Sequence, residues 1–323
     1  MKNWIATALL CACLNAQAFD LQGHRGARGL APENTIAGFA LTLGIGVDTL
    51  ETDIAVSRDG VLLISHDPAL NPDITRGPDG QFLSSRGPVI WHTDFAELQR
   101  YDVGRLKPGT RYAEQYPEQK PHDGARLPRL EELFSLVKKS GNEKVRLALE
   151  IKVRPDTPDE TMAPEPFARK LVEAVRAAGF AQRTTILSFD WRALQAVQKL
   201  APEIGTVYLS IQRQSDNIGA GKPGPWPWTA GFGHAEHGSV PKMIKAAGGR
   251  IWSAFHLDLD AAKVKEAQAL GITVLAWTVN EPAQIARAMD LGVDGIVSDR
   301  PDLVREEMRR RGMPLPAATP VTP

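Results

Sequence analysis

The chain has 323 residues, of which 43% are apolar and 24% charged, a composition typical of a globular protein with a large core. This composition excludes a disordered chain, a collagen and a coiled coil. Thirty-eight basic residues balance 38 acidic ones, so the chain lacks the uniform positive charge that non-specific nucleic-acid binding requires. We therefore expect no nucleic-acid partner, and any phosphate chemistry must be local.

Residues 1–18 have the pattern of a cleavable signal peptide. Lys2 is their only charge, residues 4–14 form an apolar run, and residues 16–18 read Ala-Gln-Ala, a small-x-small cleavage site. The run is too short to span a bilayer, and no later segment approaches ~20 consecutive apolar residues. We expect cleavage near Ala18, a periplasmic or secreted protein, and no stable membrane insertion.

Both cysteines, Cys11 and Cys13, lie inside this leader. The mature chain is therefore expected to contain neither a disulfide nor a reactive thiolate. A lipid anchor at Cys13 is the less favoured alternative, because it would leave an unusually short leader.

After the leader, β-rich runs alternate with helix-patterned stretches, which is typical of βα units around a parallel sheet. Eight such runs predict a closed (β/α)₈ barrel, or TIM barrel, over residues 19–312. The predicted strands are 21–26, 49–56, 146–152, 184–189, 204–210, 250–255, 273–279 and 295–298. The predicted helices are 34–43, 166–178, 191–200, 261–270, 282–291 and 301–310.

Two stretches interrupt the alternation, at about 67–128 and at 212–238, and both are rich in Gly, Pro and polar residues. Each follows a strand, so we expect both to be insertions on the C-terminal face of the barrel, where active sites are built. Residues 313–323 are rich in Pro, Ala and Thr, and we expect a disordered tail.

The first strand ends in Gly23-His24-Arg25-Gly26. A titratable ring beside a permanent cation suits an anionic substrate, because arginine offers a planar fork of donors and histidine exchanges protons near neutral pH. The alternative is a histidine that only caps the strand beside a surface ion pair.

The second strand carries Glu51 and Asp53, which share one face because side chains alternate along a strand. If that face is the barrel interior, the two charges require a cation, and oxygen-only ligands favour Mg²⁺ or Ca²⁺ over zinc. A solvated strand end is the alternative.

Asp59-Gly60 lies between two apolar runs and predicts a hairpin that folds residues 61–66 back on the acidic strand. A two-residue turn would pair His66 with Asp53, and a four-residue turn would pair it with Glu51. In either register, we expect His66 beside the acidic pair.

Glu150 and Lys152 repeat the two-residue spacing at the end of another strand. A simple ion pair would explain them alone. Polar side chains at three successive strand ends, however, favour a catalytic rim.

Six motifs along the chain together resemble those of the glycerophosphodiester phosphodiesterase family. They read HRGARGLAPENTIAGF, ETDIAVSRDGVLLISHDP, RLPRLEELF, LALEIK, VLAWTVN and DGIVSDRP. With the leader, the chain resembles an exported bacterial member of the family, of the periplasmic type. The resemblance implies a (β/α)₈ barrel, one divalent metal ion (Ca²⁺ or Mg²⁺) and two essential histidines. It also implies hydrolysis of small-molecule glycerophosphodiesters, such as glycerophosphocholine or glycerophosphoethanolamine, to glycerol 3-phosphate and an alcohol.

Matched motif by motif, the resemblance implies a role for each candidate residue. The metal ligands would be Glu51, Asp53 and Glu150, the acid/base pair His24 and His66, the phosphate contacts Arg25 and Lys152, and the glycerol pocket would include Trp277. Glu33 and Asn34 would support these residues or cap a helix. Asp294 and Asp299 could equally be structural.

Some alternatives stay open at this point. The second interruption contains five aromatic and histidine residues, Trp226, Trp228, Phe232, His234 and His237. They could form an aromatic wall over the site, but packing within the loop is the favoured interpretation. A phospholipase D-like or C-like barrel acting on lysophospholipids, and a non-catalytic glycerophosphodiester-binding protein, are the alternative functions. The motifs indicate neither the head group, the choice between Ca²⁺ and Mg²⁺, nor an oligomeric state.

Overall fold

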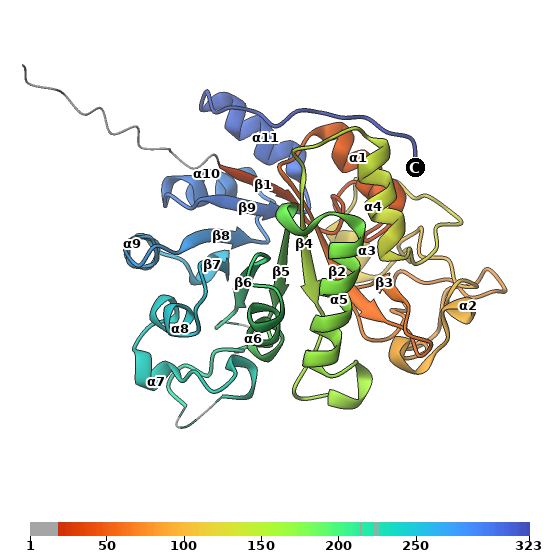
Figure 1. Cartoon of the computed structure of the whole chain (residues 1–323). Helices are drawn as coiled ribbons and strands as arrows, with labels where there is room; N and C mark the ends of the chain where they lie inside the picture. The colour runs from red at the N-terminus through yellow and green to blue at the C-terminus, as the bar shows by residue number, and fades with distance from the viewer. Residues whose placement is uncertain (1–18, 214, 223, 225) are drawn as a thin grey trace, which may run out of the picture.

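The structure is a computed structural model that describes residues 19–213, 215–222, 224 and 226–323. The predicted signal peptide and both cysteines lie outside the described residues. Within the described part, eight parallel strands form a sheet in the order β1-β9-β8-β7-β6-β5-β4-β2, and pairing of β1 with β2 closes it into a barrel (Figure 1). The predicted (β/α)₈ barrel is confirmed.

All eight barrel strands lie within the predicted strand ranges or one residue beyond them. They are β1 Asp20–Gly23, β2 Thr49–Val56, β4 Arg146–Ile151, β5 Thr184–Ser188, β6 Gly205–Ser210, β7 Ile251–Phe255, β8 Thr273–Trp277 and β9 Gly295–Ser298. A further strand, β3 Leu62–Ile64, pairs antiparallel with β2.

The helices form the outer layer of the barrel (Figure 1). The six predicted helices are present as α1 Ile36–Ile45, α5 Pro164–Ala178, α6 Trp191–Leu200, α9 Ala261–Ala269, α10 Pro282–Asp290 and α11 Pro301–Arg310. Two further helices, α4 Leu130–Lys139 and α8 Val240–Ala246, were not predicted, and the short helices α2 Phe95–Leu98, α3 Arg111–Gln115 and α7 His234–His237 lie in the two interruptions. None of the helices in the described ranges is long and apolar enough to cross a membrane.

Strand alternation divides the apolar side chains between two regions. Leu50 and Ile54 of β2 belong to the large cluster between sheet and helices, whereas Leu187, Leu209 and Leu275 belong to a separate cluster inside the barrel. Glu51 and Asp53 alternate with Leu50 and Ile54, so they face the barrel interior. The strand pattern therefore places both carboxylates inside the barrel.

The β2–β3 hairpin is present, but both predicted registers are wrong. Ile54 pairs with Ile64, and the Ser57 amide donates to the Val61 carbonyl, so the turn has three residues. Gly60 occupies the left-handed conformation that such a turn requires, at φ 82°. Extending this register places His66 opposite Thr52, just beyond the end of β3.

Residues 67–128 follow the hairpin and build a small apolar core of their own against the outer face of β3. Leu63 of β3 packs there with residues of the insertion, among them Leu70, Ile90, Phe95 and Leu98. This core explains how a segment with so little helix or strand holds a defined path.

The tail does not fit the expected disorder. Its Thr319 amide donates to the Leu43 carbonyl at 2.8 Å, and Lys139 Nζ donates to the Thr322 carbonyl at 2.9 Å. Leu315 and Val321 pack against the main core. The tail thus lies in an extended path against α1 and α4, held by hydrogen bonds and apolar contacts.

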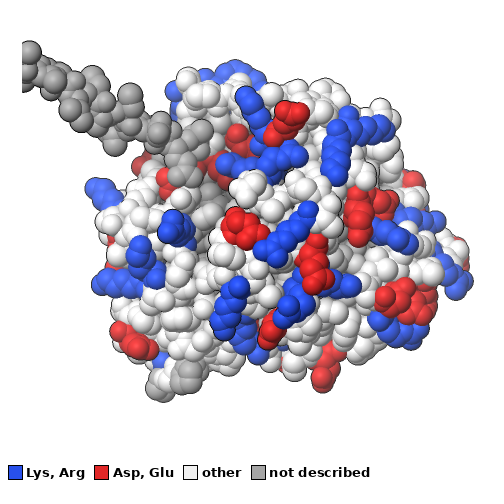
Figure 2. All heavy atoms as spheres, in the orientation of Figure 1, with Lys and Arg blue, Asp and Glu red and all other residues white. Residues whose placement is uncertain are grey.

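Basic and acidic side chains are interspersed over the face of the molecule that Figure 2 shows. This distribution agrees with the balanced composition and provides no broad basic surface on that face.

Candidate active site

A cavity of 550 Å³ opens among the carboxyl ends of the barrel strands. Seven of the candidate residues line it, namely His24, Arg25, Glu51, His66, Glu150, Lys152 and Trp277. The polar residues lie toward β1, β2 and β4, whereas Leu187 and Leu209 contribute an apolar wall from β5 and β6. The cavity has the size and mixed lining of a small-molecule site.

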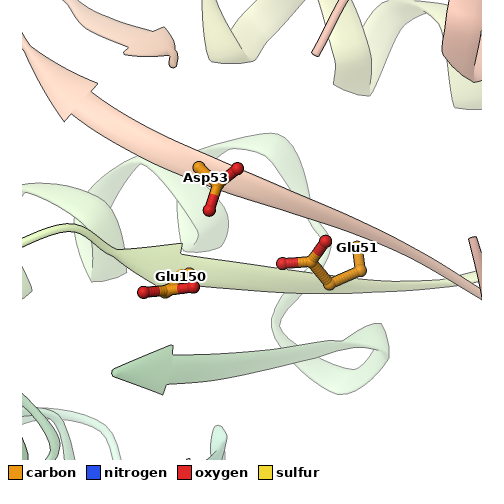
Figure 3. Close-up of side chains that lie close together, drawn as sticks. All are labelled: Glu51, Asp53 and Glu150. Atoms are coloured by element: carbon orange, nitrogen blue, oxygen red, sulfur yellow. The ribbon is translucent and has the colours of Figure 1, made fainter. Parts of the chain in front are cut away.

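Three carboxylates converge between β2 and β4 (Figure 3). Asp53 and Glu150 are direct partners in the β2–β4 register, and Glu51 lies two residues before Asp53 on the same face. One oxygen from each carboxylate lies within 4.8 Å of the others, and all three residues are buried. In addition, Asp53 Oδ1 has no hydrogen-bond partner among the residues that the structure describes. This oxygen-only donor set fits a hard divalent cation.

Crowding and burial shift the pKa values of the acidic group, which consists of Glu51, Asp53 and Glu150. Burial raises the pKa of Glu51 well above its usual value, and the Asp53 and Glu150 carboxylates add to this effect. Burial also raises the pKa of Glu150, although Lys152 opposes it. Burial alone would raise the pKa of Asp53 too, but Arg25 and Lys152 hold it far below its usual value. The site therefore favours additional positive charge.

Arg25 and Lys152 place two cations at the edge of this acidic group. Arg25 Nε lies 3.2 Å from Asp53 Oδ2, and Lys152 Nζ lies 2.8 Å from Glu150 Oε1 and 3.6 Å from Asp53 Oδ1. Burial opposes the charge of Lys152, but the two carboxylates outweigh it and raise the pKa of the ammonium. Both cations stay charged and line the cavity, where an anionic substrate could reach them.

The loop after β1 turns sharply to bring Arg25 to this position. Arg25 and Gly26 have φ angles of 50° and 71°, in the left-handed region. The turn points the Arg25 amide at Glu51 Oε2, 3.1 Å away. A side chain at position 26 would meet the backbone of Gly38 and the ring of Phe39 at 3.0 Å, which explains the glycine.

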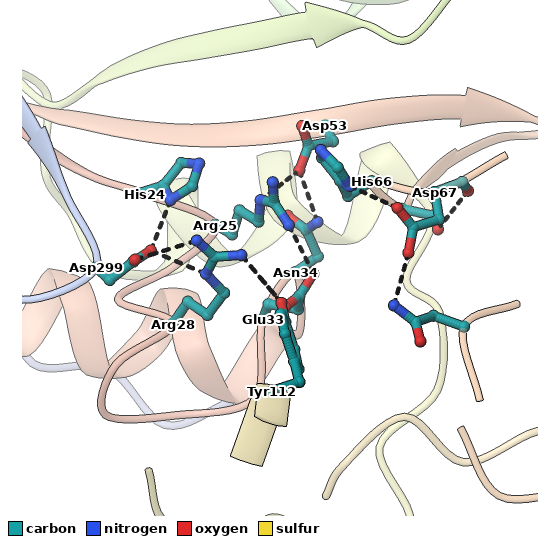
Figure 4. Close-up of polar contacts among 12 residues, drawn as sticks. His24, Arg25, Arg28, Glu33, Asn34, Asp53, His66, Asp67, Tyr112 and Asp299 are labelled. Atoms are coloured by element: carbon teal, nitrogen blue, oxygen red, sulfur yellow. Dashed lines mark hydrogen bonds and ion pairs between the residues drawn. The ribbon is translucent and has the colours of Figure 1, made fainter. Parts of the chain in front are cut away.

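His24 is held by Asp299, at the end of β9. Its Nδ1 lies 2.6 Å from Asp299 Oδ1 (Figure 4). Its Nε2 lies 3.8 Å from Glu51 Oε2. Burial lowers the pKa of His24, and Asp299 partly offsets this effect. A carboxylate on Nδ1 fixes the ring and leaves Nε2 free to act in the cavity.

His66 has a similar arrangement on the other side of the acidic group. Its Nδ1 lies 2.7 Å from Asp67 Oδ1, and Asp67 accepts a further hydrogen bond from Asn71 at 2.8 Å. Burial lowers the pKa of His66 to about 4, and the positive charges of Arg25 and Lys152 contribute. Two histidines with carboxylate partners thus line one cavity beside the acidic group (Figure 4).

Trp277, at the end of β8, lines the apolar side of the cavity. Its indole N–H donates to the Ser253 carbonyl at 3.0 Å, and Phe189 packs edge-on against its ring at 5.4 Å. Of the five aromatic and histidine residues of the 212–238 interruption, Trp228 lines the cavity, and Phe232 instead packs against Trp191. Loop packing thus accounts for Phe232, and of these five residues Trp228 alone lines the cavity in the described part of the chain.

Glu33 and Asn34 lie behind the charged residues. Glu33 Oε1 accepts from Arg25 Nη1 at 3.0 Å, and Asn34 Nδ2 donates to Asp53 Oδ2 at 2.9 Å. The helix cap is the next residue, Thr35, whose hydroxyl accepts from the Gly38 amide at 3.1 Å. Both predicted residues therefore support the site rather than cap α1.

Four residues that bind the site residues had no predicted role or an undecided one, namely Arg28, Asp67, Tyr112 and Asp299. Arg28 and Asp67 lie close to His24 and His66 inside two of the motifs that carry the family resemblance, and this position is the signal that could have identified them. For Asp299, the DGIVSD motif does not distinguish a structural role from a functional one. Tyr112 lies in the insertion outside any recognised motif, so no sequence signal identified it.

Comparison with known proteins agrees with this geometry. The family model of the glycerophosphoryl diester phosphodiesterase family matches residues 24–303. The chain belongs to this family.

Relatives match the chain over most of its length. A glycerophosphodiester phosphodiesterase of Caldanaerobacter subterraneus is 26% identical over 291 residues, which cover 90% of this chain and 97% of the relative. A crystal structure from Silicibacter pomeroyi, provisionally named a glycerophosphoryl diester phosphodiesterase, is 34% identical, has a TM-score of 0.83, and covers 92% of this chain and 95% of its own.

An Oleispira antarctica phosphodiesterase, solved in complex with the product sn-glycerol-3-phosphate, shares the fold. It is 24% identical, with a TM-score of 0.63, and the match covers 90% of this chain and 96% of that one.

Proposed function

We propose that this enzyme hydrolyses glycerophosphodiesters, such as glycerophosphocholine or glycerophosphoethanolamine, to glycerol 3-phosphate and an alcohol. We further propose that it does so with one divalent cation, Ca²⁺ or Mg²⁺, and with His24 and His66 as the acid/base pair. The convergence of Glu51, Asp53 and Glu150 beside two histidines in one cavity carries this proposal.

The balance of charge supports a divalent cation. Six carboxylates of the described site, Glu33, Glu51, Asp53, Asp67, Glu150 and Asp299, lie beside three permanent cations, Arg25, Arg28 and Lys152. The carboxylates therefore outnumber the cations, and a divalent ion between Glu51, Asp53 and Glu150 would reduce the excess of negative charge. When bound, such an ion would supply positive charge that polarises a phosphate oxygen.

Arg25 and Lys152 would bind the remaining phosphate oxygens. Both side chains line the cavity and carry charge throughout the neutral pH range. Their positive charge would stabilise the negative charge that redistributes over the phosphate in the transition state. Trp277 would pack against the glycerol carbons from the apolar wall.

His24 would act as the base. With Asp299 accepting from Nδ1, the lone pair of Nε2 is left to take a proton from the attacking hydroxyl, either the 2-hydroxyl of glycerol or water. His66, once protonated and stabilised by Asp67, would donate a proton from Nε2 to the leaving alcohol. If water attacks, the bond to the leaving alcohol breaks in one step and each histidine moves one proton. If the 2-hydroxyl attacks, that bond breaks as a cyclic glycerol phosphate forms, and water must then open the ring in a second step in which the two histidines exchange roles.

The substrate would be a small, water-soluble diester rather than an intact lipid. A cavity of 550 Å³ accommodates a molecule of this size, and a relative with the same fold was solved with sn-glycerol-3-phosphate. The alternative substrate is a lysophospholipid, whose acyl chain would lie along the apolar wall of Leu187 and Leu209.

A comparison of two substrates tests this choice. The enzyme is expected to release glycerol 3-phosphate from glycerophosphocholine at least as efficiently as it cleaves lysophosphatidylcholine. A clear preference for the lysolipid, with little activity on glycerophosphocholine, would instead support a phospholipase D-like reaction. Binding of glycerophosphocholine without any turnover would support a binding protein.

We also propose export, with the mature chain beginning at Phe19 and carrying no lipid anchor. The Ala-Gln-Ala sequence at 16–18 supports this cleavage site. Intact mass of the protein purified from its native host tests the proposal. A species that begins at a diacylglyceryl-modified Cys13 would contradict it.

A further inference from the structure

The insertion at 67–128 reaches the charged residues behind the cavity through Tyr112, on helix α3 (Figure 4). We infer that Tyr112 is a positioning residue for hydrolysis: its hydroxyl separates Arg28 from Glu33 and thereby holds both His24 and Arg25 in their working positions. The inference rests on the proposed function and assigns part of that function to the insertion.

The Tyr112 hydroxyl bridges two opposite charges. It accepts a hydrogen bond from Arg28 Nη1 at 3.0 Å and donates one to Glu33 Oε2. Burial and the Glu33 charge raise the pKa of Tyr112, so the hydroxyl keeps the proton that it donates. A single oxygen therefore satisfies a buried cation and a buried carboxylate at once.

From Arg28, the network leads to His24. Arg28 Nε and Nη2 donate to the two oxygens of Asp299 at 2.9 and 3.1 Å, and Asp299 holds His24 Nδ1 at 2.6 Å. The ring of Tyr116, also from the insertion, lies 4.8 Å from the Arg28 guanidinium and restricts it from another side. The orientation of His24 thus depends on where Arg28 is held.

From Glu33, the network leads to Arg25. Glu33 Oε1 accepts from Arg25 Nη1 at 3.0 Å, and the same guanidinium faces Asp53 through Nε at 3.2 Å. The position of this phosphate-binding cation depends on Glu33, and Glu33 in turn depends on Tyr112.

One distance shows what the hydroxyl prevents. Arg28 Nη1 lies 3.9 Å from Glu33 Oε2, which is too long for a direct hydrogen bond. Opposite charges in such a buried site attract strongly, so without the hydroxyl they would close on each other. Arg28 would then move away from Asp299, and Glu33 would move away from Arg25.

The hydroxyl is not needed to hold the insertion on the barrel. Gln119 Nε2 donates to the Arg28 carbonyl at 2.7 Å, the Lys120 amide donates to the Leu30 carbonyl at 3.0 Å, and the insertion has an apolar core of its own. Loss of one hydroxyl should therefore change the site more than the fold.

Tyr112→Phe tests this inference on the full-length mature enzyme. We expect kcat on glycerophosphocholine to fall about tenfold, with KM within about twofold, because the network acts on transition-state contacts. The matched control is Tyr101→Phe. Tyr101 packs against the apolar core of the same insertion and makes no side-chain hydrogen bond in the described structure, so its kcat should not change. A Tyr112→Phe enzyme with unchanged kcat, whether or not its melting temperature falls, overturns the inference.

A double-mutant cycle with Glu33→Gln separates positioning from a general loss of structure. If Tyr112 acts through Glu33, the two substitutions together should lower kcat much less than the product of their separate effects. Independent, multiplicative effects would overturn this route. Failure of the proposed function is a different result, since the wild-type enzyme itself would then release no glycerol 3-phosphate.

Discussion

His24 and Asp299 face each other from the ends of β1 and β9, with 2.6 Å between Nδ1 and Oδ1. These strands are neighbours in the barrel, although the two residues are 275 positions apart in the chain. Pairing of the first and the last barrel strand, β1 and β9, therefore brings the histidine to the carboxylate that fixes its tautomer. Arg28 and Asn280 bind the same carboxylate, so Asp299 itself is held in place.

Asp299→Asn should lower kcat by about 10²-fold or more, because an amide can stabilise the wrong tautomer of His24 and cannot stabilise its protonated form. The measurement is steady-state hydrolysis of glycerophosphocholine. Asp294→Asn, in the same DGIVSD motif, is the matched control, since Asp294 accepts from the Val274 amide at 2.7 Å outside the cavity. Equal kcat values for the two variants would show that Asp299 is only structural.

His24→Ala and His66→Ala should each lower kcat by about 10²-fold or more, because each would remove one of the two proposed proton-transfer groups. Circular dichroism should show intact folds. His122→Ala, an exposed histidine of the insertion that lies outside the cavity, should retain wild-type kcat. If either cavity variant also retains it, that histidine takes no part in acid/base catalysis.

Affinity for the divalent cation should rise with pH. Burial raises the pKa of Glu51 and of Glu150, so the metal-free folded protein binds protons there more tightly than the unfolded chain does. The stability contributed by those protons is present below the ordinary glutamate pKa and is lost as pH rises through the raised values. A cation must displace the same protons, so its binding strengthens over this window.

Calorimetric titration of the metal-free protein with Ca²⁺ and Mg²⁺ at about pH 5, 6 and 7 measures this dependence. Glu51→Gln is the control. It removes one of the two protons that the cation displaces, so the affinity of this variant for the cation should depend less steeply on pH. An affinity that does not change with pH would contradict the assignment of these carboxylates as ligands.

Head groups should have little influence on the rate. Most productive contacts would involve phosphate and glycerol, so kcat/KM for glycerophosphocholine, glycerophosphoethanolamine and glycerophosphoglycerol should agree within about tenfold, or ~1.4 kcal/mol. A panel assay for released glycerol 3-phosphate measures this. A larger spread would indicate that the rim of the cavity, including Trp228, selects the head group.

The sequence predicted the barrel and the inward-facing charges because both follow from local periodicity. Alternation along β2 was sufficient to place Glu51 and Asp53 on one face, and the same spacing paired Glu150 with Lys152. The structure shows these four residues together between β2 and β4.

The features that were missed depend on contacts that local patterns do not encode. The hairpin register depended on the left-handed Gly60 in a three-residue turn, so His66 fell between the two predicted pairings. The tail is held by distant partners such as Leu43 rather than by any periodic pattern of its own. Tyr112 reaches the site only because the insertion folds back on the loop after β1.

Release of glycerol 3-phosphate from glycerophosphocholine, measured before chelation, after exhaustive chelation, and after addition of Ca²⁺ or Mg²⁺, tests the central claim most directly. The convergence of the buried carboxylates Glu51, Asp53 and Glu150 predicts that chelation abolishes turnover and that a divalent cation restores it. Full activity in protein shown by elemental analysis to contain no metal would contradict the account.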